Sequence, residues 1–456
     1  MGGTITLPVW FFGLILLFAA VTFASHFLFP SVRWFLRRRA ERLVARLNER
    51  LARPIQPFKL ARRYDTIQRL IYDPVVTEAV VAHAKERGVR EDVAFEDARR
   101  YAQEIVPSFS ALTYFSIGIR AARWLATAIY TVRTGPRNRE IISSLPEDAT
   151  IIFVMNHRSN MDYVLVTYLA GEDSALSYAV GEWAQVWPIS RLFRMMGAYF
   201  IRRRSRGALY RAVLARYVDL ATRSRVTQAI FPEGGLSLDG QLAKPKMGLL
   251  SYAVQTYREG GANVVFVPVA INYDRILEDR VLIAAGKRGD RRIGAKISVV
   301  VGWVLHKVWL RIRGTYLRFG TAAVVYGTPV EMARYDAELP LDEIAEDLMS
   351  EVARAMPVLG VPLVALALEQ REEVTVDDVL ALAEGVEILG ARDTRADIVS
   401  SAIKALLGRE LIAETERGWR AVESERDVLS YYAGSIRHIV APETVPSDIG
   451  RVIKLQ

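Results

Sequence analysis

The sequence TIIFVMNHRSNMD occupies residues 150–162 and joins a short apolar run to a cluster of polar side chains. Apolar runs of this length are typical of buried parallel strands. Similar runs follow at 226–231, 264–271 and 317–326, and helical patterns separate them. Strands that alternate with helices predict an α/β fold with a mostly parallel sheet flanked by helices. In such sheets functional groups gather where strands end, which is where this polar cluster lies.

His157 and Asp162 in this cluster are the candidates for acid–base chemistry. On one helix, five residues would place their side chains about 140° apart. They can meet only if His157 lies in the loop and Asp162 in the first helical turn, for which Ser159 and Asn160 are suitable N-caps. Asp162 would then fix one imidazole tautomer, and the other ring nitrogen would take a proton from a substrate hydroxyl. The alternative is that the pair only ties down a loop.

Four basic side chains are candidates for binding a phosphate. Arg202 and Arg203 end an aromatic run, and paired guanidiniums suit a phosphate dianion. Because further arginines follow, a solvated basic surface is the alternative for this pair. Lys244 and Lys246 would add positive charge for the same ligand.

Two further segments complete the predicted site. The sequence FPEGG at 231–235 follows an apolar run. Its glycines, Gly234 and Gly235, permit close backbone approach to a ligand, and Glu233 could accept hydrogen bonds from a polyol. The strand expected at 267–273 is apolar enough to line a slot for an acyl chain.

Composition removes several kinds of site. The chain contains no cysteine, which excludes disulfides, thiolate zinc sites and a cysteine acyl-enzyme. Its five histidines are far apart in the sequence, so no metal site is expected.

The N-terminal part combines an apolar segment with a basic one. Residues 7–29 contain no Asp, Glu, Lys or Arg, and as a helix they would span roughly 35 Å, enough to cross a bilayer core. Residues 31–63 contain 11 Lys or Arg and two Glu, a net +9 that equals the charge of the whole chain. We therefore expect a single-pass inner-membrane protein whose remaining part is cytoplasmic and contacts membrane lipid. A cleaved signal peptide is disfavoured because the first ten residues hold no positive charge.

The C-terminal part is mainly helical in pattern, and residues 410–422 predict a β-hairpin. Helices followed by a hairpin suggest a winged-helix-like module, so a membrane-tethered nucleic-acid-binding protein is a remote alternative. The hairpin segment carries both signs of charge, whereas a wing that reads DNA is normally more basic. We therefore expect no nucleic acid as a partner.

Four blocks of the sequence together resemble the glycerolipid acyltransferase superfamily, and specifically the bacterial glycerol-3-phosphate 1-O-acyltransferases. The family's HxxxxD block resembles His157–Asp162, and its FIRR block resembles Phe200–Arg203. The EGG block resembles Glu233–Gly235, and the fourth block resembles the sequence from Val267 onward. The resemblance covers roughly residues 73–438, and four blocks in register make it specific.

The resemblance implies transfer of a fatty acyl group from acyl-CoA or acyl-carrier protein to the sn-1 hydroxyl of glycerol 3-phosphate. The product would be lysophosphatidic acid, the first intermediate of phospholipid biosynthesis. His157 and Asp162 would form the catalytic dyad, and no metal or organic cofactor would be required. Backbone amides near the helix start would stabilise the oxyanion and the phosphate. The residues that the resemblance implies for binding glycerol 3-phosphate are Arg158, Ser159, Arg203 and Glu233.

One departure from the family pattern concerns the third block, which usually continues as EGGRSR. Here Leu236 and Leu238 take the places of the arginines. Either Arg202, Lys244 and Lys246 supply the phosphate-binding charge, or the acceptor is another molecule, such as dihydroxyacetone phosphate or lysophosphatidate. A catalytically silent lipid-binding homologue is a further alternative, which the intact dyad disfavours.

These patterns divide the chain into four expected parts. Residues 1–30 form a transmembrane anchor, and residues 31–135 form a basic amphipathic and helical region. Residues 136–335 form the acyltransferase domain, with a glycerolipid acyltransferase-like α/β fold. Residues 336–456 form the helical C-terminal region.

Overall fold

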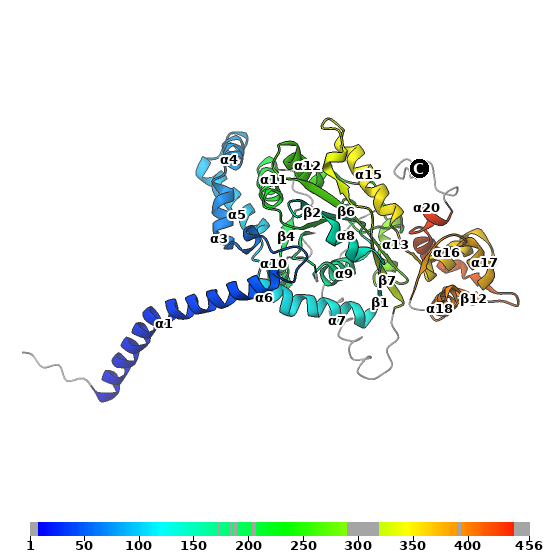
Figure 1. Ribbon diagram of the computed structural model, residues 1–456, viewed down its shortest axis with the longest axis horizontal. Coiled ribbons are helices and arrows are strands. Elements are labelled where there is room, and N and C mark those ends of the chain that lie inside the picture. Colours follow the sequence, from blue (N-terminus) through cyan, green and yellow to red (C-terminus); the bar gives the residue numbers. More distant parts are fainter. Residues whose placement is uncertain are drawn as a thin grey trace, which may run out of the picture. The chain divides into compact units, whose positions relative to one another are not determined.

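The computed structural model describes the residues 8–171, 173–181, 185, 189–202, 207–289, 319–390 and 394–441. The chain forms two compact units, residues 1–54 and residues 55–456 (Figure 1).

The first unit is built on one long helix, α1 (Val9–Asn48). The start of the helical region expected at 31–135 is therefore part of a helix that begins in the apolar segment. Residues 1–7, and most of the side chains between 23 and 40, lie outside the described residues, and so do Leu7 and the side chains of 23–29 in the expected membrane span at 7–29. Within the part of the chain that is described, no helix contains an apolar stretch of the length needed to cross a membrane.

The second unit is organised around an eight-stranded sheet with the strand order β1-β7-β6-β2-β5-β3-β4, in which β8 also pairs with β6. All pairs are parallel except those of β6 with β7 and with β8. The prediction of a mostly parallel sheet is thus confirmed. Its strands are β1 (Thr131–Thr134), β2 (Thr150–Met155), β3 (Ser177–Gly181), β4 (Ala198–Ile201), β5 (Gln228–Ile230), β6 (Val264–Tyr273), β7 (Thr321–Tyr326) and β8 (Val330–Glu331).

Strand β2 lies in the middle of the sheet and every one of its residues is buried. Its side chains alternate between the two faces, as the strand geometry requires. Ile151, Phe153 and Met155 pack into the cluster that contains α7 (Ile119–Ile129) and α9 (Met161–Ala170). The side chains between them pack on the opposite face, against α12 (Gly248–Arg258) and α15 (Leu341–Arg354). Burial on both faces explains the uninterrupted apolar run in the sequence.

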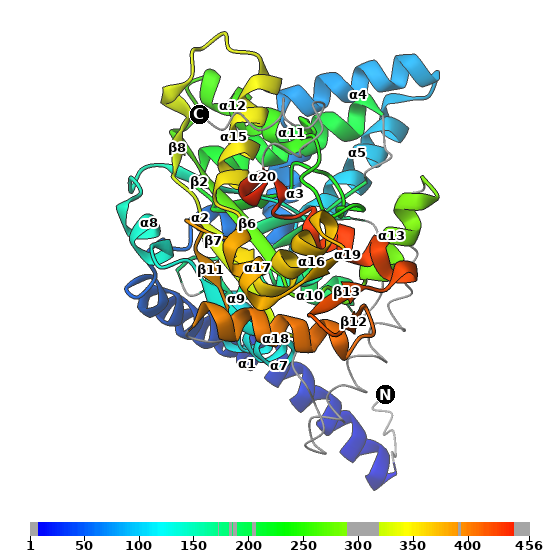
Figure 2. The same ribbon diagram turned by 90° about the vertical axis from the view of Figure 1, so that its right-hand side faces the viewer.

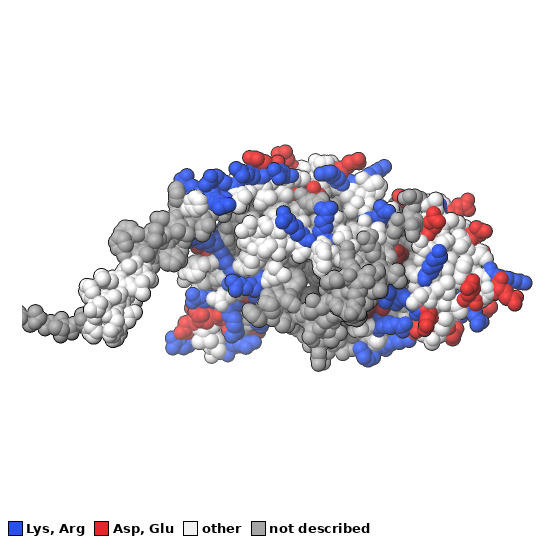
Figure 3. All heavy atoms as spheres, turned by 90° about the horizontal axis from the view of Figure 1, so that it is seen from below, with Lys and Arg blue, Asp and Glu red and all other residues white. Residues whose placement is uncertain are grey.

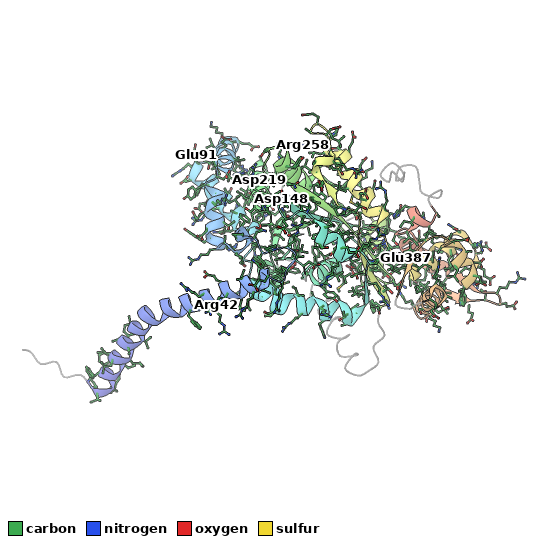
Figure 4. The ribbon with its side chains drawn as sticks, in the orientation of Figure 1. Arg42, Glu91, Asp148, Asp219, Arg258 and Glu387 are labelled. Carbon is green, nitrogen blue, oxygen red and sulfur yellow. The ribbon has the colours of Figure 1, made fainter. Side chains whose placement is uncertain are left out.

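Helices cover both faces of the sheet, and a cluster of helices joins it near β4 (Figures 1 and 2). Arg258, labelled in Figure 4, donates to the carbonyl oxygen of Leu339 and so ties α12 to the segment before α15. The π-helical turn Tyr114–Gly118 lies directly before α7. The other helices before the C-terminal part are α2 (Pro57–Leu60), α3 (Arg63–Ile71), α4 (Pro74–Arg87), α5 (Glu91–Ile105), α6 (Ala111–Thr113), α8 (Asn138–Ser144), α10 (Ile189–Met195), α11 (Ala208–Arg223), α13 (Asp279–Lys287) and the 3₁₀ turn Met332–Arg334.

The C-terminal part contains a helix, a short strand, two helices and a hairpin, in the order of a winged helix. The hairpin expected at 410–422 is confirmed as β12 and β13, and β10 pairs with β13 to complete a three-stranded sheet. Side chains of both charge signs are exposed on this part (Figure 3). Its elements are β9 (Val358–Leu359), α16 (Gly360–Gln370), β10 (Glu373–Val374), α17 (Val376–Leu382), β11 (Ile388–Leu389), α18 (Arg395–Leu407), β12 (Ile412–Glu414), β13 (Trp419–Ala421), the 3₁₀ turn Glu423–Glu425, α19 (Arg426–Ala433) and α20 (Arg437–Val440).

Helix α19 packs against the loop that follows β5. A Cβ atom built at Gly240, whose φ is +83°, would lie 1.8 Å from the carbonyl oxygen of Tyr431. A Cβ atom built at Gly434 would lie 2.9 Å from the carbonyl oxygen of Asp239. The loop and the C-terminal helix therefore meet backbone to backbone.

Gly240→Ala should destabilise the protein more than Gly88→Ala, a matched control. Both glycines have a positive φ, but a Cβ atom at Gly88 would meet nothing within 4 Å. The control should lose about 1–2 kcal/mol for the left-handed backbone alone. The Gly240 variant should lose at least about 2 kcal/mol more, because the backbone of Tyr431 must also move. Thermal or urea unfolding measures both losses, and equal losses would contradict the close packing seen here.

Candidate active site

The site lies where β2, β5 and β6 end. The side chain of Asn156, the first residue after β2, pairs with the backbone of Ile271 in β6. Its Nδ2 donates to the carbonyl oxygen of Ile271 at 2.9 Å, and its Oδ1 accepts from the amide of Ile271 at 2.8 Å. This pair extends the β2–β6 ladder by one step through a side chain, and it fixes the direction in which the chain leaves the sheet.

His157 and Asp162 form the hydrogen-bonded pair that their spacing predicts. His157 lies in the loop after β2, Asp162 lies in the first turn of α9, and 2.9 Å separates Nδ1 from Oδ2. The two residues are 2% and 0% exposed. With Nδ1–H donated to the carboxylate, Nε2 is the nitrogen that can accept a proton. The rings of Phe231 and Tyr163 pack against the imidazole and restrict its rotation. Their centroids lie 4.3 Å and 5.4 Å from the centroid of the imidazole ring.

Asp162 accepts three further hydrogen bonds. Its Oδ2 accepts from the amides of Arg158 at 2.7 Å and Ser159 at 3.0 Å, and its Oδ1 accepts from the hydroxyl of Tyr273 at 2.5 Å. Burial raises the pKa of the Tyr273 phenol well above its usual value, so this hydroxyl stays protonated as a donor. We did not predict Tyr273 as a site residue. The available signal was its position at the end of β6, beside the end of β2.

Glu233 holds the loop of His157 in place. Its Oε1 accepts from the amide of His157 at 2.9 Å, and its Oε2 accepts from the amide of Ala243 at 3.3 Å. The side chain is 2% exposed, and burial raises its pKa to about 8. The Glu233 side chain therefore links the EGG block to the HxxxxD block by its hydrogen bond to the backbone amide of His157.

The segment after Glu233 folds back so that Lys246 lies against Pro232 and Gly234. The amide of Lys246 donates to the carbonyl oxygen of Pro232 at 2.7 Å, and a Cβ atom at Gly234 would lie 2.9 Å from Cδ of Lys246. Gly235 is half-buried, and Lys244 is exposed. The structure thus places Gly234 and Lys246 together beside the loop of His157.

Ser159 and Asn160 bind a carboxylate that the sequence analysis missed. The hydroxyl of Ser159 donates to Glu278, at 3.2 Å to Oε1 and 3.1 Å to Oε2. The backbone amide and Nδ2 of Asn160 donate to Oε1 at 2.8 Å and 3.1 Å. The expectation that Asn160 caps α9 with its side chain is wrong, whereas Ser159 Oγ does accept from the amide of Met161 at 3.1 Å.

The amides at the start of α9 are already occupied, which corrects the expectation that they bind the oxyanion and the phosphate. Carboxylates of Glu233, Asp162 and Glu278 accept from the amides of residues 157–160, and the next amide donates to a serine hydroxyl. Side-chain acceptors have satisfied the donors that a helix N-terminus would otherwise offer to an anion.

Arg158 presents the unsatisfied donors of the site. Its side chain is 2% exposed, Nη1 donates to the carbonyl oxygen of Gly240 at 2.6 Å, and the guanidinium carbon lies 5.3 Å from the ring centroid of Tyr431. Its Nε and Nη2 atoms are buried and have no hydrogen-bond partner in the part of the chain that the structure describes. Nε–H and Nη2–H are the two parallel donors with which arginine grips a carboxylate or a phosphate.

Arg202 is not brought to this site. Arg202 follows β4, three strands from β2 and therefore roughly 14 Å away across the sheet. Its guanidinium donates to both carboxylate oxygens of Glu104, at 2.6 to 3.0 Å. Arg203 lies outside the described residues. Within the described ranges, no three His, Asp or Glu side chains are grouped so as to hold a metal ion.

Comparison with known proteins finds a family model and relatives that are similar to this chain. Residues 137–272 match the family model described as Acyltransferase. Curated relatives named glycerol-3-phosphate acyltransferase include one from Ectopseudomonas mendocina (strain ymp), 27% identical over 84% of this chain and 49% of its own length. Another, from Aeromonas hydrophila subsp. hydrophila, is 27% identical over 87% of this chain and 52% of its own length. The chain thus spans about half the length of the curated relatives it matches.

A solved structure, the 1-acyl-sn-glycerophosphate acyltransferase PlsC from Thermotoga maritima, matches 52% of this chain and 74% of its own chain. The match has 22% sequence identity and a TM-score of 0.32.

The family model and the curated relatives confirm the resemblance seen in the four blocks. Residues 137–272 thus match an acyltransferase family model, and most of the chain is similar to part of the bacterial glycerol-3-phosphate acyltransferases.

Proposed function

We propose that this enzyme transfers a fatty acyl group from acyl-CoA or acyl-carrier protein to the sn-1 hydroxyl of glycerol 3-phosphate. The product is lysophosphatidic acid, and the reaction is the first step of phospholipid biosynthesis. The observation that carries the proposal is the His157–Asp162 pair next to Arg158, whose two free donors suit a phosphate. A general base and a phosphate-binding group on adjacent residues fit a small acceptor that carries both a hydroxyl and a phosphate.

The proposed mechanism is direct transfer in a ternary complex. Nε2 of His157 removes the hydroxyl proton as the acceptor oxygen attacks the thioester carbonyl carbon. The new C–O bond forms, the C–S bond breaks, and the thiolate leaves with the bonding electrons, so it needs no proton from the enzyme. Asp162 stabilises the imidazolium that forms, through its hydrogen bond to Nδ1.

Arg158 supplies the phosphate-binding charge in this proposal. The third block lacks the arginines typical of the family, because Leu236 and Leu238 stand there. Of the substitutes considered from the sequence, Arg202 is paired with Glu104, while Lys246 lies beside Gly234. Arg158 has the free pair of donors, and it follows the base directly in the chain.

His157→Ala should lower kcat by about 10²–10⁴, the usual contribution of a general base. Asp162→Asn should also cause a large loss, because its amide cannot both orient and stabilise the imidazolium. Transfer of labelled palmitate from palmitoyl-CoA or palmitoyl-carrier protein to glycerol 3-phosphate measures the loss. A folded His157→Ala protein, shown by its circular dichroism and thermal midpoint, with wild-type kcat would remove the dyad from the mechanism.

Arg158→Lys should raise KM for glycerol 3-phosphate by about 10-fold or more, because lysine keeps the charge but loses the paired donors. KM for the acyl donor should not change. Arg202→Lys is the matched control and should leave both constants within about twofold of wild type. If Arg202→Lys instead raises the acceptor KM and Arg158→Lys does not, the phosphate binds elsewhere.

The same assay, repeated with other acceptors, tests the alternative substrates. Dihydroxyacetone phosphate and lysophosphatidate also carry a phosphate and a free hydroxyl, so Arg158 alone does not separate them from glycerol 3-phosphate. A kcat/KM for either that exceeds the value for glycerol 3-phosphate would replace the acceptor in our proposal.

We also propose that the enzyme is attached to the inner membrane through the apolar part of α1, with the acyltransferase domain in the cytoplasm. The product is an amphiphile, so release at a lipid surface suits the reaction. The support is a run of exposed apolar side chains: Val9, Trp10, Phe11, Phe12, Leu14, Ile15, Leu16, Leu17, Phe18 and Val21.

The full-length chain should therefore stay with membranes after a high-salt and carbonate wash. A variant with Leu14→Arg and Leu17→Arg should move to the soluble fraction, because each buried arginine costs about 2.5–3.5 kcal/mol in a bilayer. Fractionation followed by immunoblotting measures the distribution. An unchanged membrane fraction for the double variant would contradict attachment through this helix.

A further inference from the structure

The C-terminal helix α19 contributes a side chain to the phosphate-binding part of the site. Tyr431 lies on this helix, more than 270 residues after Arg158 in the sequence, yet its ring centroid is 5.3 Å from the guanidinium carbon. Tyr431 is 2% exposed and Arg158 is 2% exposed, so the contact is made in the interior. A guanidinium over a tyrosine ring is attracted most strongly when both groups are removed from water.

The contacts of Arg158 fix which of its donors stay free. Nη1 is bound to the carbonyl oxygen of Gly240, and the guanidinium packs near the aromatic ring. In the planar guanidinium, the remaining Nε and Nη2 donors form one edge and point in nearly the same direction. These are the atoms without a hydrogen-bond partner among the described residues. Buried donors without partners are costly, which is the mark of a position completed by a ligand.

A small turn links Tyr431 to the catalytic loop. The amide of Ser237 donates to the carbonyl oxygen of His157 at 2.9 Å, and the hydroxyl of Ser237 donates to the carbonyl oxygen of Gln241 at 2.8 Å. The hydroxyl of Tyr431 lies 3.4 Å from the carbonyl oxygen of Ser237. The backbone of Tyr431 also packs directly on Gly240, whose carbonyl oxygen holds Arg158. Tyr431 thus contacts Arg158 and also the turn that binds Arg158.

The neighbouring carboxylate does not take over the free edge. Glu233 is near enough for the charge of Arg158 to lower its pKa, although burial raises that pKa more. Both carboxylate oxygens of Glu233 instead accept backbone amides, those of His157 and Ala243. The guanidinium is therefore held by an aromatic ring and a neutral carbonyl, and its positive charge stays available to an anion.

We infer that Tyr431 is a positioning residue for acceptor binding: it holds the Arg158 guanidinium so that Nε and Nη2 receive the phosphate of the acceptor. The inference rests on the proposed function and assigns a role to the C-terminal region, whose α19 completes the acceptor site. Tyr431 acts through Arg158 and does not itself touch the reacting atoms.

Kinetics of four proteins test the inference: wild type, Tyr431→Leu, Tyr431→Phe and Ser430→Ala. Ser430 is exposed on the same helix and serves as the matched control. Tyr431→Leu should raise KM for glycerol 3-phosphate by about 10-fold, since it removes a desolvated cation–π contact. It should leave KM for palmitoyl-CoA within about twofold of wild type, because the contact does not involve the acyl donor. Tyr431→Phe keeps the ring and should restore most of the acceptor affinity.

A double-mutant cycle with Arg158→Ala separates positioning from a structural role. If Tyr431 acts through Arg158, adding Tyr431→Leu to Arg158→Ala should change the acceptor KM by less than about twofold. Calorimetric titration of each full-length variant with glycerol 3-phosphate measures the same effect on binding without catalysis. Thermal midpoints report any general loss of folding, which would raise both KM values or lower the active fraction.

Other outcomes would contradict either the positioning role of Tyr431 or the proposed function. An unchanged acceptor KM in Tyr431→Leu, or independent effects in the cycle, would remove the positioning role while the proposed function stands. Equal losses of acceptor affinity in Tyr431→Phe and Tyr431→Leu would show that the effect comes from the hydroxyl and not from the ring. This outcome would also remove the positioning role of the ring. A wild-type enzyme that neither binds nor acylates glycerol 3-phosphate would remove the proposed function, and this inference with it.

Discussion

The buried carboxylate of Asp162 is the group on which the site depends. It is 0% exposed, and a carboxylate in that position is stable only when donors surround it. Its four donors come from His157, Arg158, Ser159 and Tyr273, on a loop and a neighbouring strand. Because all four donors bind one carboxylate, the charge that orients the imidazole also fixes the backbone of Arg158. The His157 imidazole and the backbone of Arg158 are therefore positioned by one network.

The sheet register makes this network possible. Parallel pairing of β2 with β6 over six residues brings the end of β2 beside the end of β6. The Asn156 side chain continues that pairing beyond the strand, and Tyr273 then reaches Asp162 from β6. A shift of one residue would turn Tyr273 to the opposite face of the sheet and remove a donor from the carboxylate. The pairing of β2 with β6 therefore also determines the geometry of the His157–Asp162 pair.

Local features of the sequence were enough to predict the sheet, the hairpin and the arrangement of His157 and Asp162. Continuous apolar runs mark β2 and β6, and a spacing of five restricts how a pair can meet. Contacts between distant segments could not be predicted in this way. Tyr273 and Glu278 form hydrogen bonds to residues of the segment 157–162 that lie 111 and 119 positions away in the sequence. Arg202 pairs with Glu104, which lies 98 positions away. The strands β1, β3, β4 and β8 were missed because they are short and stand outside the long apolar runs, whereas the equally short β5 lies within the run at 226–231. The helix amides were expected to be free because the sequence does not show which carboxylates reach them.

The unused donors of Arg158 favour an acceptor that brings its own negative charge. Three buried carboxylates, Asp162, Glu233 and Glu278, have their oxygens bound by backbone amides, hydroxyls or the imidazole. Burial raises the pKa of Glu233 to about 8 and also raises that of Glu278, as expected for anions removed from water. Arg158 is the buried cation beside them whose donors are partly unused. A phosphate that binds Arg158 would add negative charge near His157, and negative charge stabilises the imidazolium that forms when the base takes the hydroxyl proton. Acceptor binding and activation of the acceptor hydroxyl are then coupled through adjacent residues, so a hydroxyl compound without the phosphate would lose both affinity and reactivity.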